Sequence, residues 1–387
     1  GKSTFFKAAT LAEVEIANYP FTTIKPNHAV GFVKVDCVDK EFNVKCNPRL
    51  GYCLKGNRFI PVDLIDVPGL IPGSHQGLGM GLEFLNDLNQ ADVLIHIIDV
   101  SGSTNEKGEV IEPLSYDPAR DIAFLEHELD MWYFRLVSKG WEKFARTVNQ
   151  ERPELHKAVA QQLSSLRVTE ILMEEVIEKL NLPQDIMKWD KDVLLRIAID
   201  LRKATKPMLI ACNKIDVSGA GKNFEALKEK FRDCTLIPCS AESELALREA
   251  AKHELIDYIP GEAHFKIKNE EKLNAKQKNA LNFIKMNVLE KYGSTGIQDV
   301  LDRAVFELLK YIAIFPGGVN KLTDQHGNVL PDCFLMPPKS TALDFAFKLH
   351  TDIGNHFIKA IDVKTKRPVG KEYLLKNRDV IEIATSK

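Results

Sequence analysis

The sequence lacks any apolar run long enough to cross a bilayer. Its longest apolar runs, such as VLIHIIDV at 93–100, have the length of a strand, whereas a membrane-spanning helix needs about 20 residues. No secretory signal is visible, although the chain begins at Gly1 without Met. The net charge of −2 excludes a polycation, so a nucleic-acid contact would have to come from a local patch. We therefore expect a cytoplasmic protein that makes no membrane contact.

Paired cysteines are also missing. The seven cysteines include no C-x-x-C pair, and their odd number and scatter predict reduced thiols in a cytosolic protein. Cys37, Cys46 and Cys53 gather around one loop, but their spacing matches no usual zinc pattern, which argues against a metal there. Cys212 and Cys239 lie in apolar, strand-like runs and are expected in the core.

Length and hydrophobic pattern predict an α/β protein of several domains. A chain of 387 residues is long for a single core. Continuously apolar runs at 93–100, 207–213 and 235–240 are typical of strands covered on both faces. The runs at 30–37 and 59–66 are also strand-like. Because strands alternate with helical stretches, we predict a doubly wound, parallel sheet that binds ligands beyond the carboxyl ends of its strands.

A long helical stretch interrupts this alternation. Residues 118–204 show helical periodicity, with a helix start at Pro118 and a break at Pro183. The stretch is too long for one crossover helix, so we predict a helical insertion. Trp132 and Trp141 are expected in its core rather than in a cofactor site.

The rest of the chain completes the predicted domain layout. A second helical stretch ends in DVLDRAVFELLKYIAIF, and a small β-grasp-like α+β module follows, with a strand in LPDCFLMPP, a helix in STALDFAFKLH and a last strand in DVIEIAT. The predicted domains are a nucleotide domain at 1–105 and 205–262, a helical insertion at 106–204, a helical connector at 263–315, and the C-terminal module at 316–387.

The chain opens on GKST, the end of a phosphate-binding loop. In such loops a Lys contacts the β and γ oxygens of the nucleotide, and a Ser or Thr hydroxyl binds Mg²⁺. Gly1, Lys2 and Ser3 match this G-K-[ST] ending, and Thr4 opens the predicted helix. The first glycine of the loop and the strand before it are absent from the sequence, so the motif is half observed.

Two later segments have the positions of nucleotide switches. In NYPFTTIKPN, Thr23 can complete the coordination of Mg²⁺ once a γ-phosphate is present, with Thr22 as the alternative. In DVPG, Asp66 at a strand end can reach the hydration shell of Mg²⁺, and the N–H of Gly69 can meet the γ-phosphate. A glycine-rich run, LIPGSHQGLGMG, follows and suggests a mobile segment.

The NKID motif at 213–216 predicts the base. The carboxylate of Asp216 can accept hydrogen bonds from N1–H and N2–H₂ of guanine, and adenine offers no equivalent pair. Asn213 would brace the loop, and the stem of Lys214 would pack on the base. A backbone N–H at Ser240 or Ala241, in CSAE, can meet guanine O6. Four motifs in this order predict a P-loop protein that binds GTP or GDP with Mg²⁺ and hydrolyses GTP.

Longer strings resemble one family. NYPFTTIKPN, DVPGLIPGSHQGLGMGLEFL and YDPARDIAFLEHEL are similar to the Obg-related, YchF-like branch of translation-associated GTPases. LMPPKSTALDFAFKLHTDIGNHF with LLKNRDVIEIAT resembles a TGS domain. The resemblance covers essentially the whole chain. It implies a P-loop G domain with a helical insertion, a C-terminal TGS domain, and a ribosome or tRNA as partner.

The chain departs from this family in ways that bear on the reaction. YchF proper carries an altered base-reading motif and prefers ATP, whereas NKID makes this chain resemble a GTP-preferring relative of archaeal type. Leu70 stands where Ras-type enzymes place a Gln, so intrinsic hydrolysis should be slow. His75 could position the water instead, or it is a solvated loop histidine. Potassium-dependent relatives carry an Asn in the missing part of the P-loop, so the sequence neither predicts nor excludes potassium.

A second hypothesis is an RNA- or ribosome-binding protein whose nucleotide site is structural, slowly hydrolysing or ATP-preferring. Residues 316–387 hold 11 Lys and Arg against 8 Asp and Glu, a net charge of +3. That charge is compatible with an RNA contact, with Lys364, Lys366 and Arg367 as the closest cluster. Many solvated domains are equally basic. The complete NKID and DVPG motifs favour the switch.

Overall fold

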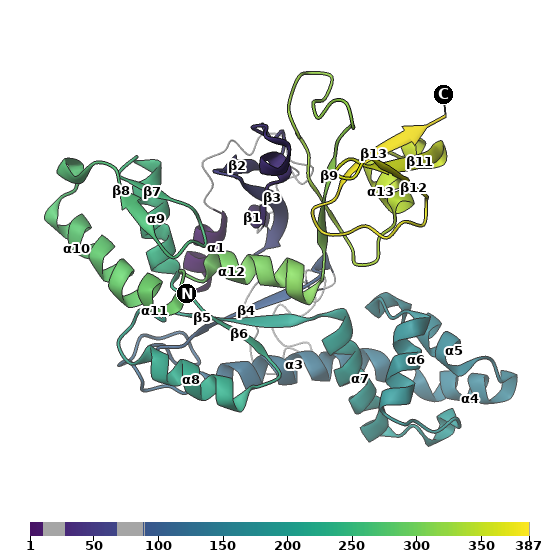
Figure 1. The fold of residues 1–387 in the computed structure, drawn as a ribbon. Coiled ribbons are helices and arrows are strands. Elements are labelled where there is room, and N and C mark those ends of the chain that lie inside the picture. Colours follow the sequence, from purple (N-terminus) through teal and green to yellow (C-terminus); the bar gives the residue numbers. More distant parts are fainter. Residues whose placement is uncertain (11–27, 68–87, 89, 387) are drawn as a thin grey trace. The chain divides into compact units, whose positions relative to one another are not determined.

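The computed structural model describes residues 1–10, 28–67, 88 and 90–386 (Figure 1). The chain forms two compact units. The first combines Gly1–Leu64 with Pro238–Lys387, and the second is Ile65–Ile237. No helix in the described ranges is both long and apolar enough to cross a membrane.

The first unit begins with a helix and a three-stranded sheet. The helix is α1 (Lys2–Thr10), and the sheet has the order β1 (His28–Asp36), β3 (Asn57–Ile65), β2 (Tyr52–Leu54), with β2 antiparallel to β3. Phe32, Tyr52 and Phe59 pack together in this sheet, and the rings of Tyr52 and Phe59 stack at 4.5 Å. The helix α1 packs on β1 and on two later helices, α9 (Ala241–Lys252) and α12 (Ile297–Asp302).

The middle of this unit differs from its prediction. We predicted helix over 263–315, and the structure has helices there, but Phe265–Ile267 and Ile312–Pro316 are strands. Lys310 has a left-handed backbone (φ 54°), which ends the helical run before YIAIF. The elements in this part are β7 (Ile256–Tyr258) antiparallel to β8 (Phe265–Ile267), α10 (Ala275–Ile284), a π-helix (Lys285–Leu289), α11 (Glu290–Tyr292), α12 and a second π-helix (Arg303–Leu308).

The C-terminal sheet confirms the predicted strands and helix of the last module. Its order is β10 (Phe334–Met336), β9 (Ile312–Pro316), β13 (Val380–Thr385), β11 (Phe357–Asp362), β12 (Arg367–Val369), and its helices are α13 (Ala342–Leu349) and α14 (Thr351–Asn355). Thr341 and Asp344 form a capping box at the start of α13. Phe345 of this helix is fully buried with Ile314 and Ala360 of the sheet.

The second unit holds a sheet with a parallel pair of strands, as predicted. Its order is β4 (Leu94–Asp99), β5 (Met208–Asn213), β6 (Thr235–Pro238), and α8 (Ala220–Lys230) follows β5. The strands β4 and β5 are parallel and pair from Leu94 opposite Met208 to Asp99 opposite Asn213. The two strands therefore end at the same level, which brings the residues after them together. Cys212 is fully buried, as predicted.

The long helical stretch forms its own core beside this sheet. Its helices are α3 (Ala119–Ser138), α4 (Trp141–Glu151), α5 (Leu155–Gln162), α6 (Glu170–Lys179) and α7 (Lys191–Thr205). Trp132 and Trp141 are buried in this core, and Trp141 stacks on Trp189 with ring centroids 5.7 Å apart. Their prediction as core residues is confirmed. Pro118 caps α3, and Pro183 follows the end of α6, as the breaks in periodicity predicted.

Candidate nucleotide-binding site

An ion pair joins the ends of β4 and β5. Lys214 follows β5 directly and has a left-handed backbone (φ 65°). Its Nζ lies 2.8 Å from Oδ2 of Asp99 and 3.0 Å from Oγ of Ser103. Because Asp99 ends β4, the register of the sheet places this carboxylate where it fixes Lys214. The NKID lysine is thus held by contacts within the protein.

The Asp99 carboxylate is held in its charged form. The hydroxyls of Ser101, Ser103 and Thr104 donate to it, with distances of 2.9 Å from Ser103 and 2.7 Å from Thr104. Burial raises the pKa of Asp99, but the hydrogen bonds from Lys214 and these hydroxyls outweigh it, and the pKa lies below its ordinary value. Asp99 therefore stays ionised at neutral pH and keeps its attraction for Lys214.

The other NKID residues divide into a buried support and an accessible reader. Asn213 is only 4% exposed, and its backbone C=O accepts from Val100 N–H at 3.0 Å. The N–H of Val217 donates to the C=O of Lys214 at 3.1 Å and closes the turn around Asp216. The Asp216 carboxylate is partly exposed and has no hydrogen-bond partner among the described residues. It is thus able to accept the two hydrogen bonds that guanine offers.

Our reading of the motifs missed Asp99, Ser103 and Thr104. The available signal is weak: a carboxylate at the end of VLIHIIDV and the hydroxyl-rich SGST after it. Nothing in the chain tells which strand neighbours β5, since Asp99 and Lys214 are 115 residues apart. The pairing of β4 with β5 supplies that information.

The GKST string forms the N-terminus of α1 in the first unit. The C=O of Gly1 accepts from Phe5 N–H at 3.0 Å, so the helix is formed from its first residues. Gly1, Lys2 and Ser3 are exposed and Thr4 is half-buried. The unsatisfied N–H groups and the dipole of a helix N-terminus attract anions such as phosphate. The position of GKST therefore suits the role predicted for it.

Ser240 caps α9 in the same unit. Its Oγ accepts from Ser243 N–H at 3.2 Å, and its own N–H donates to the C=O of Thr295 at 2.9 Å. Ser240 and Ala241 are both fully buried. Gly296 (φ 80°) lets the two segments meet, since a Cβ there would lie 2.1 Å from the C=O of Pro238. The backbone N–H of Ser240 is thus engaged inside the protein.

The predicted switch residues are described only in part. Asp66 follows β3 directly, is half-buried and belongs to the second unit. The other predicted switch residues, Thr22, Thr23, Gly69 and His75, lie outside the described residues. So does Leu70, which stands where Ras-type enzymes place a Gln.

Comparison with known families covers most of the chain. Residues 1–125 match the family described as 50S ribosome-binding GTPase. Residues 211–318 match the G4 motif-containing domain of Obg-like, YGR210-like GTPases, and residues 322–385 match the TGS domain. The predicted fold class, a P-loop GTPase with a C-terminal TGS domain, is confirmed.

Similar proteins extend these matches to the full length. An uncharacterized GTP-binding protein of Methanocaldococcus jannaschii is 46% identical over 387 residues, which are 100% of this chain and 96% of that protein. One of Schizosaccharomyces pombe is 35% identical over 352 residues, covering 88% of this chain and 85% of its own.

Two solved structures are also similar. The crystal structure of a GTP-binding protein from Pyrococcus horikoshii is 39% identical, with a TM-score of 0.76 over 100% of this chain and 97% of its own. The YchF GTPase of Schizosaccharomyces pombe shares the fold, with a TM-score of 0.58 at 19% identity over 99% of this chain and 94% of its own. Together with the motif geometry, these matches show that the chain belongs to the Obg-like, YchF-type family of GTP-binding proteins with a C-terminal TGS domain.

Proposed function

We propose that this protein is a switch that binds and slowly hydrolyses GTP and acts on ribosomes or tRNA in the cytoplasm. The observation that supports GTP binding is the geometry of the NKID turn. Lys214 is held by Asp99 at 2.8 Å, and the Asp216 carboxylate is left without a partner among the described residues. A half-buried carboxylate without a partner favours a base that donates hydrogen bonds to it, and guanine is such a base.

The base would be selected by hydrogen-bond matching. Asp216 would accept from N1–H and N2–H₂ of guanine, while adenine has an acceptor at N1 and no amino group at C2. The stem of Lys214, fixed at its Nζ, would lie against the base. Asn213, buried and tied to Val100, would keep the turn rigid. The contact to guanine O6 would come from the backbone N–H of Ala241, because that of Ser240 donates to the C=O of Thr295.

The phosphates and Mg²⁺ would be held by the remaining motifs. The residues proposed for the phosphates are Gly1, Lys2, Thr4 and Gly69, and those proposed for Mg²⁺ are Ser3, Thr23 and Asp66. The exposed hydroxyl of Ser3 and the half-buried carboxylate of Asp66 are oxygen ligands of the kind that Mg²⁺ prefers. When bound, Mg²⁺ neutralises charge on the β- and γ-phosphates.

The slow rate follows from the residue after DVPG. The side chain of Leu70 has no atom that can hydrogen-bond a water, so the attacking water would be positioned by another group, for which we propose His75. Thr23 and Gly69 would couple the γ-phosphate to their loops. Hydrogen exchange over 18–27 and 66–81 should then be slower with a GTP analogue than with GDP.

The proposed RNA contact rests on the TGS domain. Lys366 and Arg367 are exposed, whereas Lys364 pairs with Glu41 at 2.7 Å and is partly neutralised. The basic cluster is therefore smaller than its sequence indicates. The size of this cluster bears on the RNA contact and does not distinguish the switch from a structural nucleotide site.

The test is the substitution Asp216→Asn. The change replaces two acceptor oxygens by one acceptor and one donor, so it should weaken GTP binding by up to about 10⁴-fold. The same amide complements xanthine, which has a C=O where guanine has its C2 amino group, so binding of XTP should rise. Asp192→Asn, an exposed aspartate on α7, is the matched control and should change neither affinity.

Equal affinity of the unchanged protein for GTP and ATP would overturn the assignment of the base. Single-turnover hydrolysis at saturating GTP addresses the switch separately. His75→Ala should slow this step on the order of 10²-fold without weakening binding. GTP binding without measurable hydrolysis, and with identical hydrogen exchange in the GTP-analogue and GDP states, would favour the structural nucleotide site.

A further inference from the structure

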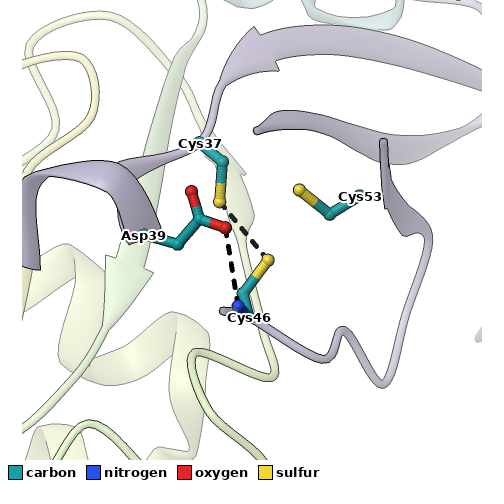
Figure 2. A group of neighbouring side chains, drawn as sticks. All are labelled: Cys37, Asp39, Cys46 and Cys53. Carbon is teal, nitrogen blue, oxygen red and sulfur yellow. Dashed lines mark hydrogen bonds between the residues drawn. The ribbon is translucent and has the colours of Figure 1, made fainter. Parts of the chain in front are cut away.

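Three thiols and a carboxylate converge beside the first sheet (Figure 2). Cys37 follows β1, Asp39 lies in the 3-10 helix Val38–Phe42, Cys46 lies in the loop after it, and Cys53 lies in β2. One ligand atom from each residue can be chosen so that all four lie within 4.8 Å of one another. Figure 2 shows the sulfurs and the carboxylate turned toward one shared space.

The carboxylate of Asp39 is buried with one oxygen unsatisfied. Asp39 is only 6% exposed, and its Oδ2 accepts from Cys46 N–H at 3.5 Å. Its Oδ1 is buried without a hydrogen-bond partner among the described residues. Cys37 and Cys46 beside it are buried as well, and Cys53 is half-buried. A buried, unpaired carboxylate oxygen costs several kcal/mol in order-of-magnitude terms unless a cation or donor meets it.

The spacing of the sulfurs suits a mononuclear metal. The Sγ atoms of Cys37 and Cys46 are 3.5 Å apart. Tetrahedral zinc with Zn–S bonds of about 2.3 Å separates its ligand sulfurs by roughly 3.8 Å. A disulfide would instead require about 2.05 Å between these atoms. A multi-iron cluster has its cysteines on different irons, which needs a wider cage than these four groups form.

We propose that Cys37, Asp39, Cys46 and Cys53 form a structural site for one thiolate-preferring divalent cation, Zn²⁺ first among them. Four protein ligands leave no open position, which is typical of structural rather than catalytic zinc. Three thiolates and a carboxylate leave the loaded site with a charge of about −2. Arg58 is fully buried and lies opposite Cys53 in the register of β2 and β3, so it supplies a positive charge beside the proposed site.

The site would order the loop that holds the C-terminal domain. The loop between Cys37 and Cys53 donates from Asn47 N–H to the C=O of Val329 at 3.0 Å, and Arg49 pairs with Asp332 at 2.7 Å. Glu41 in the 3-10 helix pairs with Lys364. A metal that crosslinks the two ends and the middle of this loop would hold these contacts in place.

The first experiment measures metal on the full chain purified under reducing conditions. We expect one zinc per chain by mass spectrometry of the metal, and its release on modification of the thiols with an organomercurial. The metal-free protein titrated with Co²⁺ should gain thiolate-to-cobalt charge-transfer absorption and tetrahedral d–d bands. These measurements on the unchanged protein do not depend on whether any variant folds.

The second experiment uses variants. Cys53→Ser, at the half-buried ligand, should weaken cobalt and zinc binding by more than about 100-fold. Cys234→Ser is the matched control, because Cys234 is also half-buried but lies in the other unit, and it should leave metal binding unchanged. Asp39→Asn should remove the carboxylate ligand and weaken binding while keeping all thiols.

Metal removal should also loosen the docking of the C-terminal domain. Hydrogen exchange over 329–332 should speed up in the metal-free protein and slow again when zinc is restored. The proposal is overturned if the reduced, unchanged protein neither retains a metal nor develops the cobalt spectrum. It is also overturned if the protein, isolated without metal, has lost two hydrogens by mass through a Cys37–Cys46 disulfide.

Discussion

Asp99→Asn tests whether the ion pair behind the NKID turn contributes to nucleotide affinity. Asn has nearly the shape of Asp but lacks the charge that holds Lys214. In the structure the Asp99 side chain is 10% exposed and that of Lys214 is 30% exposed, so solvent screens the pair only in part. The substitution should leave the sheet intact, since β4 and β5 pair through their backbones.

The size of the effect follows from the contacts that are lost. Hydrogen bonds to charged groups contribute about 1.5–3 kcal/mol each. Lys214 keeps its second contact, to Ser103 Oγ at 3.0 Å, so only part of its restraint is lost. With about 1.4 kcal/mol for each tenfold in affinity, the Kd should rise roughly 10- to 100-fold. GTP and GDP should be affected equally, because Lys214 is assigned to the base and not to the γ-phosphate.

The assay is titration of a fluorescent GDP and a fluorescent GTP analogue near neutral pH. Ser103→Ala is the control, since it removes the weaker contact to Lys214 and should cost less than about tenfold. A Kd within twofold of the unchanged protein, with an unchanged melting curve, would refute the reasoning. So would a loss confined to GTP.

The same ion pair predicts a dependence of stability on pH. Burial raises the pKa of Asp99 in the folded protein, but the hydrogen bonds from Lys214 and the three hydroxyls outweigh burial. The net result is a lowered pKa. A lowered carboxylate pKa means that the stabilisation is complete above the ordinary pKa and is lost as pH falls through the folded one. Asp99→Asn should therefore flatten the acid side of the stability curve.

Two further predictions concern stability. Burial lowers the pKa of His96 to about 4, so the folded protein should lose about 1–3 kcal/mol as pH falls from 6.5 toward 4, and His96→Leu should remove that loss in denaturant melts. Arg58→Leu should destabilise by about 2–5 kcal/mol, because the buried guanidinium donates to the C=O groups of Leu330 and Pro331 at 3.0 and 2.8 Å. Arg49→Ala removes the half-exposed ion pair with Asp332 and should lower stability by less than about 1 kcal/mol in the same melts. Equal losses for the Arg49 and Arg58 variants would contradict the larger role given to Arg58.

Local pattern was enough to locate most strands and the helical insertion. The runs at 93–100 and 207–213 are predominantly apolar, and they became β4 and β5 with only their ends trimmed. Pro118 and Pro183 marked helix ends because proline restricts the residues around it wherever it stands. The prediction failed at YIAIF, since a short apolar run suits a buried helix end as well as a strand. Pairing with β10 and β13 decided for the strand.

The chemistry of base selection was readable from the chain alone, because NKID supplies a carboxylate and an amide within four consecutive residues. The residue that holds Lys214 in place could not be identified from the chain alone. Asp99 meets Lys214 across 115 residues because two parallel strands end at the same level. Cys37, Cys46 and Cys53 have a spacing that argued against a metal. They meet because the end of β1, the loop after it and β2, two strands away in the same sheet, come together. Residue types and local order are properties of the sequence, whereas the distances between remote side chains are set by strand pairing and register.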